Sequence, residues 1–189
     1  SAIAEINTTS VDVNEVGHLF NYDVLPDING GNTGVDRVVI TAPAGYSNFS
    51  VNAVSVAGAP LGANCPAPGA GEYCGVIAGQ DMIITLGTKL AATANINVQF
   101  AADAPGTAGS ADFTATVEDT ATAMAPQGIV AGNADGDPFD DNSITVLVIF
   151  QVNPIRSSVS ASPSVVPVTS PWSGWRSRSK LPACERNPS

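Results

Sequence analysis

The chain has 189 residues, of which 44% are hydrophobic and 13% are charged, and its formal net charge is -10. A chain of this length by default forms one folded core with a tail. The acidic balance excludes nucleic acid as a partner of the body, since affinity for phosphate needs clustered Lys and Arg, and no run approaches the roughly 20 apolar residues of a membrane span.

Charge divides the chain into two segments. Residues 1–154 carry two basic side chains, Arg37 and Lys89, against sixteen acidic ones, a net charge of -14. Residues 155–189 carry five basic side chains and one acidic side chain, a net charge of +4. Their Pro- and Ser-rich composition cannot build a separate core. We therefore predict a domain over residues 1–154, followed by a basic, extended tail over residues 155–189.

The first 13 residues, SAIAEINTTSVDV, are the first element in chain order. They lack the basic and apolar regions of a signal peptide, and we expect the numbering to begin after a removed one. The segment alternates poorly but holds four apolar residues, Ile3, Ile6, Val11 and Val13. It is predicted to act as an exchanged strand that fills a groove in a neighbouring copy.

Period-two alternation then predicts a series of half-buried strands. Phe20, Tyr22 and Val24, for example, alternate with polar residues. Alternation marks the strands over residues 20–24, 96–100 and 113–117, and further strands are expected over residues 35–41, 49–56, 73–77 and 82–86. A change in the apolar phase of FSVNAVSV predicts a bulge near Ala53. Roughly eight to ten strands between Gly- and Pro-rich turns predict an all-β fold, an antiparallel Ig-like or jelly-roll sandwich.

Two of the three cysteines enclose a loop. Cys65 and Cys74 flank the Pro- and Gly-rich stretch PAPGAGEY, which two nearby strands could close with a disulfide. Such a bond contributes about 2 to 3 kcal/mol by the loop-entropy model. The other reading is two free thiols in a cytosolic loop. Cys184, in the tail, is either free or bonded to another chain. We predict the disulfide, and with it an extracellular or cell-surface location.

The stretch AGNADGDPFDDNS, residues 131–143, gathers oxygen-bearing side chains between two apolar stretches. Carboxylate and amide oxygens in a tight, Gly-containing turn are the ligands that Ca²⁺ prefers. The candidate ligands are Asn133, Asp135, Asp137, Asp140, Asp141 and Asn142. Pro138 interrupts the stretch, and no Glu stands where an EF-hand loop needs one. The pattern therefore leaves two interpretations, a calcium site or a solvated acidic hairpin.

The following segment, residues 143–152, is apolar on both faces, because Leu147 and Ile149 lie opposite the main apolar row. Such a strand is either central in a sheet or covered by a neighbouring subunit. In the tail, the stretch VVPV could lie along a partner as an edge strand. The candidate assembly residues of the tail are Trp172, Trp175, Arg176 and Arg178.

Four stretches together resemble the Ig-like β-sandwich modules of large bacterial secreted and cell-surface proteins. They are NTGVDRVVITAPAGYSNFSVNAVSV, ITLGTKL, INVQFAADAPGTAGSADFTATVEDTATA and AGNADGDPFDDNSITVLV. The resemblance implies structural work, as in stalks, adhesins, surface layers and filament subunits. Such modules normally stand in tandem, whereas this chain holds a single copy without an internal repeat. A lone module with a special tail indicates a subunit that assembles with copies of itself.

Catalysis has little support in the sequence. His18 is the only histidine and lies beside apolar residues in VGHLF, which favours a structural role. No nucleophile-elbow, metalloprotease or phosphate-binding motif is present. We therefore predict a non-enzymatic structural subunit of an extracellular filament or cell-surface assembly, which forms a homopolymer by strand or tail exchange.

The alternative function is a calcium-assisted carbohydrate-binding or adhesin module, whose partner is a cell-surface polysaccharide. Its candidate stacking residues are Tyr22, Tyr46, Tyr73, Trp172 and Trp175. Two glycosylation sequons, at Asn7 and Asn48, fit a secreted surface. Chance alone yields about as many sequons in an Asn- and Thr-rich chain.

Overall fold

The computed structural model describes residues 1–28, 34–121, 126–137 and 142–151. The chain divides into two units, Ser1–Asn153 and Pro154–Ser189, and all the described residues belong to the first unit. These residues include no helix, and hence none that could cross a membrane. The predicted tail residues Trp172, Trp175, Arg176, Arg178 and Cys184 lie outside the described residues.

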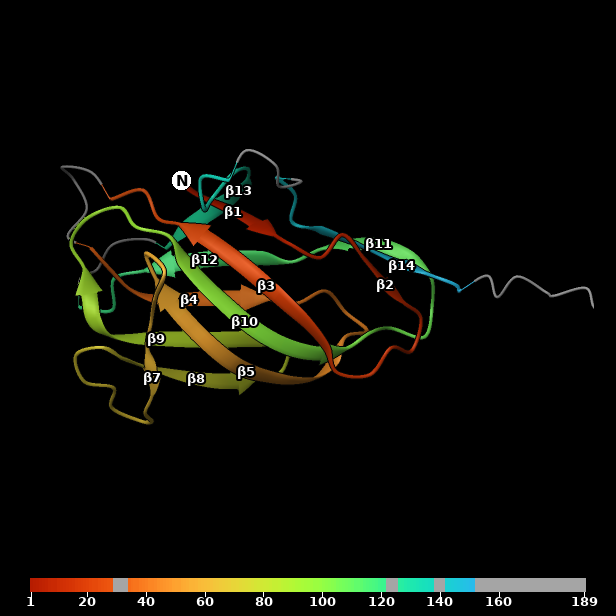
Figure 1. Cartoon of the computed structure of the whole chain (residues 1–189), viewed down its shortest axis with the longest axis horizontal. Coiled ribbons are helices and arrows are strands. Elements are labelled where there is room, and N and C mark those ends of the chain that lie inside the picture. Colours follow the sequence, from red (N-terminus) through yellow and green to blue (C-terminus); the bar gives the residue numbers. More distant parts are fainter. Residues whose placement is uncertain (29–33, 122–125, 138–141, 152–189) are drawn as a thin grey trace, which may run out of the picture. The chain divides into compact units, whose positions relative to one another are not determined.

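The described part of the chain is built from β-strands (Figure 1). They are β1 Ala2–Ile6, β2 Ser10–Asp12, β3 His18–Leu25, β4 Val35–Thr41, β5 Ser47–Val56, β6 Ala59–Pro60, β7 Gly62–Ala63, β8 Glu72–Ala78, β9 Asp81–Leu90, β10 Ile96–Asp103, β11 Gly109–Asp112, β12 Thr114–Glu118, β13 Gln127–Ala131 and β14 Thr145–Ile149. Each of the predicted strands is present, and the observed strands mostly extend the predicted ones by a few residues.

Eleven strands form one sheet in the order β6-β5-β10-β3-β1-β13-β12-β4-β9-β8-β7. β13 joins its two halves, because it pairs with β1 on one side and with β12 on the other. The halves face each other: β3, β10 and β5 run diagonally across β4 and β9 in Figure 1. A Cβ added to Gly75 in β8 would lie 3.0 Å from Val51 in β5. The predicted all-β sandwich is confirmed.

The sandwich is not purely antiparallel, which corrects the prediction. Three strand pairs are parallel: β1 with β13, β14 with β2, and β7 with β8. Two of these pairs use residues 1–13, which were expected to fill a neighbouring copy. Instead, β1 and β2 pair with other strands of the same chain, β1 in the large sheet and β2 in a three-stranded sheet. Ile6 and Val11 are buried, and Val13 packs against the core. Only Ile3 of the four apolar residues is exposed, at 37%.

The core lies between the two halves of the large sheet. Its centre is an aromatic cluster of Phe20, Tyr46, Phe100 and Phe113, whose contacting rings have centroids 4.9 to 6.0 Å apart. Aromatic pairs at such distances contribute beyond the area they bury. The Tyr22 hydroxyl donates a hydrogen bond of 2.8 Å to the carbonyl oxygen of Phe113. Burial raises the pKa of Tyr22 far above its ordinary value.

The bulge predicted in β5 is present. Gln99 of β10 pairs with Ala53, whereas the next residue, Phe100, pairs with Val51. Asn52 is therefore the extra residue on β5. The bulge turns Val54 into the core after the change of phase that is visible in the sequence.

β14 is the central strand of a separate three-stranded sheet, in the order β11-β14-β2. Val146 and Val148 are buried on its inner face. Leu147 and Ile149 on the other face are 45% and 39% exposed. The strand is thus central, and its second apolar row faces outward in the single chain.

Candidate functional site

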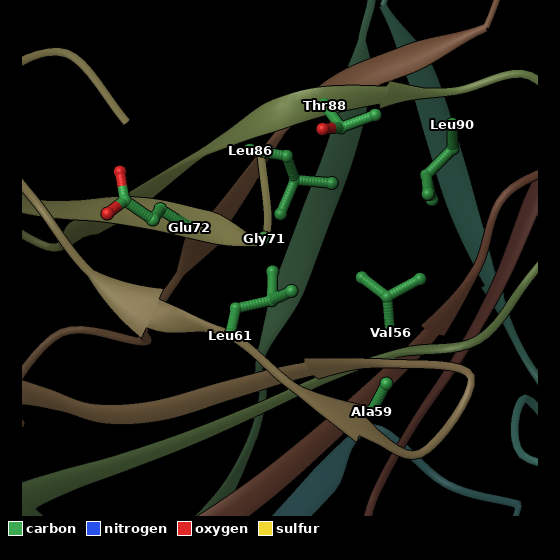
Figure 2. Close-up of a pocket in the computed structure, with 8 residues that line it drawn as sticks. All are labelled: Val56, Ala59, Leu61, Gly71, Glu72, Leu86, Thr88 and Leu90. Atoms are coloured by element: carbon green, nitrogen blue, oxygen red, sulfur yellow. The ribbon is translucent and has the colours of Figure 1, made fainter. Parts of the chain in front are cut away.

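An apolar groove opens between the β5–β6 and β8–β9 strand pairs, near the edge strands of the large sheet. Its lining residues are Val56, Ala59, Leu61, Gly71, Glu72, Leu86, Thr88 and Leu90, around a cavity volume of about 260 Å³. Figure 2 shows the side chains of Val56, Leu61 and Leu86 pointing into the same space, whereas the carboxylate of Glu72 turns away from it. The groove can therefore accept aliphatic side chains with little polar matching.

The wall of the groove at Glu72 is fixed by polar contacts and by a disulfide. Glu72 Oε2 accepts hydrogen bonds of 2.7 Å from both Asn64 Nδ2 and the backbone N–H of Gly69. These bonds, the one from Asn64 first, lower the pKa of the Glu72 carboxyl. The enclosing loop is closed by a disulfide between Cys65 and Cys74, whose Cα atoms are 4.9 Å apart.

The opposite end of the sandwich carries exposed apolar side chains. Val16, Leu19 and Phe150 are 80%, 50% and 63% exposed. The length of β10 gives the distance between the two ends. Ile96 of β10 pairs with Val56 at the groove, whereas residues 102 and 103 pair with His18 of β3 and Ser47 of β5 at the opposite end. Six to seven residues at about 3.3 Å each place the ends roughly 20 Å apart. The described chain ends at Gln151, beside Phe150 at this far end.

A polar site, separate from the groove, lies on the outer face of the sheet, under the loop that follows β13. Glu5 and Asp23 are directly paired in β1 and β3, and they are buried, with 0% and 3% exposure. Glu5 Oε1 accepts backbone hydrogen bonds from Ala134 and Asp135 at 2.7 and 3.2 Å. Sequence reasoning missed Glu5. The available signal was an acid within an apolar stretch, AIAEI.

The predicted calcium ligands are only partly described. Asp135, Asp137 and Asn142 are exposed, and Asn133 is half-buried. Within the loop, Asn133 Oδ1 accepts from the Gly136 N–H at 2.6 Å, and Asp135 Oδ1 accepts from the Asp137 N–H at 2.7 Å. Asp140 and Asp141 lie outside the described residues. Across the described ranges, no three His, Cys, Asp or Glu side chains are grouped so as to hold a metal.

The single histidine makes structural contacts. His18 Nδ1 lies 2.6 Å from Glu15 Oε1, and the ring packs on Phe20 with centroids 4.8 Å apart. The hydrogen bond with His18, followed by one from the Asp12 N–H, lowers the pKa of Glu15. These contacts tie the β2–β3 turn to the start of β3.

The two sequon side chains are exposed but already hydrogen-bonded. Asn48 Nδ2 donates to Asp103 Oδ2 at 2.6 Å, and Asn7 Nδ2 lies 3.5 Å from Asp23 Oδ2. Asn48 also has a positive φ of 53°. Glycan attachment at either position stays a prediction, and at Asn48 it would replace a short hydrogen bond.

The three tyrosines predicted to stack on carbohydrate are unavailable for that role. Tyr22, Tyr46 and Tyr73 are 0%, 2% and 4% exposed, because all three point into the core. The alternation that marks Tyr22 as a strand residue also places it on the inner face. A carbohydrate platform built from these residues is therefore wrong.

The sequence matches no protein-family model and no curated protein. Among solved structures, the chain is similar to BcpA, the major pilin subunit of Bacillus cereus, at 17% identity and a TM-score of 0.45, covering 79% of this chain and 40% of that chain. It is similar to a C-terminal fragment of the major pilin GBS80 of Streptococcus agalactiae at 12% identity and a TM-score of 0.40, covering 68% of this chain and 52% of that chain.

A putative membrane anchored protein from Corynebacterium diphtheriae is similar at 15% identity and a TM-score of 0.41, covering 78% of this chain and 35% of that chain. The match thus spans about half or less of the length of each of these three proteins. All three TM-scores are below 0.5, so the fold assignment comes from the strand pairing of this chain alone.

Proposed function

We propose that the chain is a structural subunit of an extracellular filament or cell-surface assembly, in which the tail of one copy binds the groove of the next. The observation that carries the proposal is the groove between β5–β6 and β8–β9, which the described residues leave open and which is lined almost entirely by apolar side chains. The disulfide between Cys65 and Cys74 supports an extracellular location, because such bonds persist in oxidising compartments.

The tail is the better candidate for exchange because β1 is already used. Ala2, Ala4 and Ile6 are buried in the chain's own core, so residues 1–13 could reach a neighbour only by leaving it. The tail carries a net charge of +4 against -14 for residues 1–154, and it holds the apolar stretch VVPV at residues 165–168. Opposite charge favours encounter, and aliphatic side chains suit the groove.

The position of the groove gives the assembly a direction. The described chain ends at Gln151, roughly 20 Å from the groove along the strands. A contact between one end of a copy and the opposite end of the next is heterologous, and such contacts generate an open fibre unless the rotation closes a ring.

Electron microscopy of the purified full chain tests this proposal. We expect filaments from the full chain, and none after deletion of residues 155–189. Ala59→Glu places a charge at the exposed mouth of the groove and should also abolish filaments. Ala78→Glu, at a position in β8 that is also exposed but lies outside the groove lining, is the matched control and should leave filaments intact. Unchanged filaments from the truncated chain would refute tail exchange.

A further inference from the structure

A second cluster of oxygen ligands, independent of the groove, lies where β1, β3 and the loop at residues 132–137 meet. We propose that this cluster binds a divalent cation, Ca²⁺, between Glu5 and Asp23 and beneath the loop. The proposed site differs from the one suggested by the sequence, since its acids come from two strands and are buried. Its failure would leave the assembly proposal standing.

Glu5 has an unsatisfied oxygen. The residue is 0% exposed, and Oε1 is held by the backbone N–H groups of Ala134 and Asp135. Oε2 is buried as well, and it has no hydrogen-bond partner among the described residues. Removing a carboxylate oxygen from water without a partner is unfavourable. The geometry therefore favours a positively charged ligand at Oε2.

Asp23 supplies the second carboxylate. It stands directly opposite Glu5 in the antiparallel β1–β3 pair, so both side chains project from the same face of the sheet. Asn97 Nδ2 lies 3.1 Å from each of its oxygens, and Asn95 Nδ2 lies 3.0 Å from Oδ1. Two carboxylates side by side in a buried setting repel each other. A divalent cation between them balances both charges.

Neutral oxygen ligands lie around the two acids. Asn95 Nδ2 is 3.4 Å from the carbonyl oxygen of Ala134, which brings a main-chain oxygen close to Asp23. The amide of Asn7 is 3.5 Å from Asp23 Oδ2. Rotating an Asn amide by about 180° exchanges its nitrogen for its oxygen, so an amide that donates to Asp23 can instead present Oδ1 to a cation.

The ligand chemistry selects the type of cation. Carboxylate, amide and carbonyl oxygens in an irregular arrangement are what Ca²⁺ takes up, with about six to eight ligands. Transition metals prefer imidazole and thiolate ligands. The described residues near Glu5 supply neither, since His18 is engaged with Glu15 and Cys65 with Cys74.

Calorimetric titration of the full chain with Ca²⁺, after treatment with EDTA, tests the site. We expect one Ca²⁺ per chain. At a Ca²⁺ concentration about 100 times Kd, Tm should rise by roughly 5 to 10 °C. Glu5→Gln keeps the shape of the side chain but removes its charge, and it should abolish both responses. Asp137→Asn changes an exposed acid of the same loop and should retain them.

The outcomes separate this site from its alternatives. If Glu5→Gln does not fold, Asn95→Ala replaces it, with an expected loss of affinity of about tenfold or more. No heat and no change in Tm at about 10 mM Ca²⁺, above the range of weak extracellular sites, would overturn the proposal. Binding that is lost in Asp137→Asn but retained in Glu5→Gln would also overturn the proposal.

Discussion

The contact between β9 and the disulfide loop makes Gly87→Ala a sharp test of the groove wall. A Cβ on Gly87 would lie 1.8 Å from the carbonyl oxygen of Gly69 and 2.8 Å from the carbonyl carbon of Pro68. To reach ordinary van der Waals separation, the loop must retreat by roughly 1.5 Å. Cys65 resists this movement because it is bonded to Cys74 in β8. Overpacking of this kind costs about 1 to 3 kcal/mol.

Urea unfolding followed by circular dichroism measures this cost. Gly128→Ala in β13 is the matched control, because a Cβ there meets nothing within 4 Å. That variant should be neutral, or more stable by up to about 1 kcal/mol, through reduced entropy of the unfolded chain. Gly87→Ala should lower the urea midpoint without changing the slope m.

Removing the disulfide completes the test. In a Cys65→Ser, Cys74→Ser background the loop is free to move, so Gly87→Ala should cost less than about 1 kcal/mol there. Loss of the disulfide alone should destabilise the chain by about 2 to 3 kcal/mol. If Gly87→Ala costs the same in both backgrounds, or no more than Gly128→Ala, the loop does not brace β9 and the reasoning fails.

Three further predictions concern polar groups outside the groove. Lys89 Nζ lies 2.6 Å from Asp119 Oδ1, and the Asp119 side chain is 1% exposed. Lys89→Met leaves this buried charge without its cation, so it should lower the free energy of unfolding in urea by about 2 to 4 kcal/mol. Adding Asp119→Asn should restore part of the lost stability. The pKa of Glu15 is lowered in the folded state, so its contribution to stability is present above its ordinary pKa of 4.5 and is lost as the pH falls through the folded value. Glu15→Gln should flatten the dependence of Tm on pH in this acidic range, and an unchanged slope would contradict the bond with His18. The Tyr46 hydroxyl is buried without a hydrogen-bond partner among the described residues, and burial raises its pKa to about 12. Tyr46→Phe should therefore leave stability unchanged or raise it by up to about 1 kcal/mol. A clear loss of stability would show that the hydroxyl has a partner.

The strands that sequence patterns predict are those whose two faces differ strongly. In β10, Ile96, Val98 and Phe100 point inward while Asn97 and Gln99 point outward, so the alternation is visible in the sequence. The place of β1 in the chain's own sheet is not predicted by the sequence, because the inner face of β1 carries the small residues Ala2 and Ala4 and its outer face carries Ile3 and Glu5. Its burial comes from pairing with β13, in which Ala2 meets Ile129, and no local pattern encodes such a distant contact.

The candidate sites divide in the same way. The pairing of Cys65 with Cys74 follows from their closeness in the sequence. The buried acids and the groove depend on register and on contacts between distant strands. From the sequence, Asp23 is only a polar residue of the predicted strand over residues 20–24, because its partner Glu5 meets it through the β1–β3 register. Residue chemistry predicts that oxygen ligands exist, but only the topology decides which of them face each other.

The parallel pairing of β2 with β14 has a mechanical consequence. β2 stands near the start of the domain and β14 at its end, with Ser10 paired to Leu147 and Asp12 to Ile149. A pull applied upstream of β2 and downstream of β14 drags two parallel strands past each other lengthwise. The hydrogen bonds between the two strands are then loaded in shear and must break together. They do not open one after another, as they would if the strands were pulled apart from one end. We therefore expect this pairing to resist tension applied along the chain.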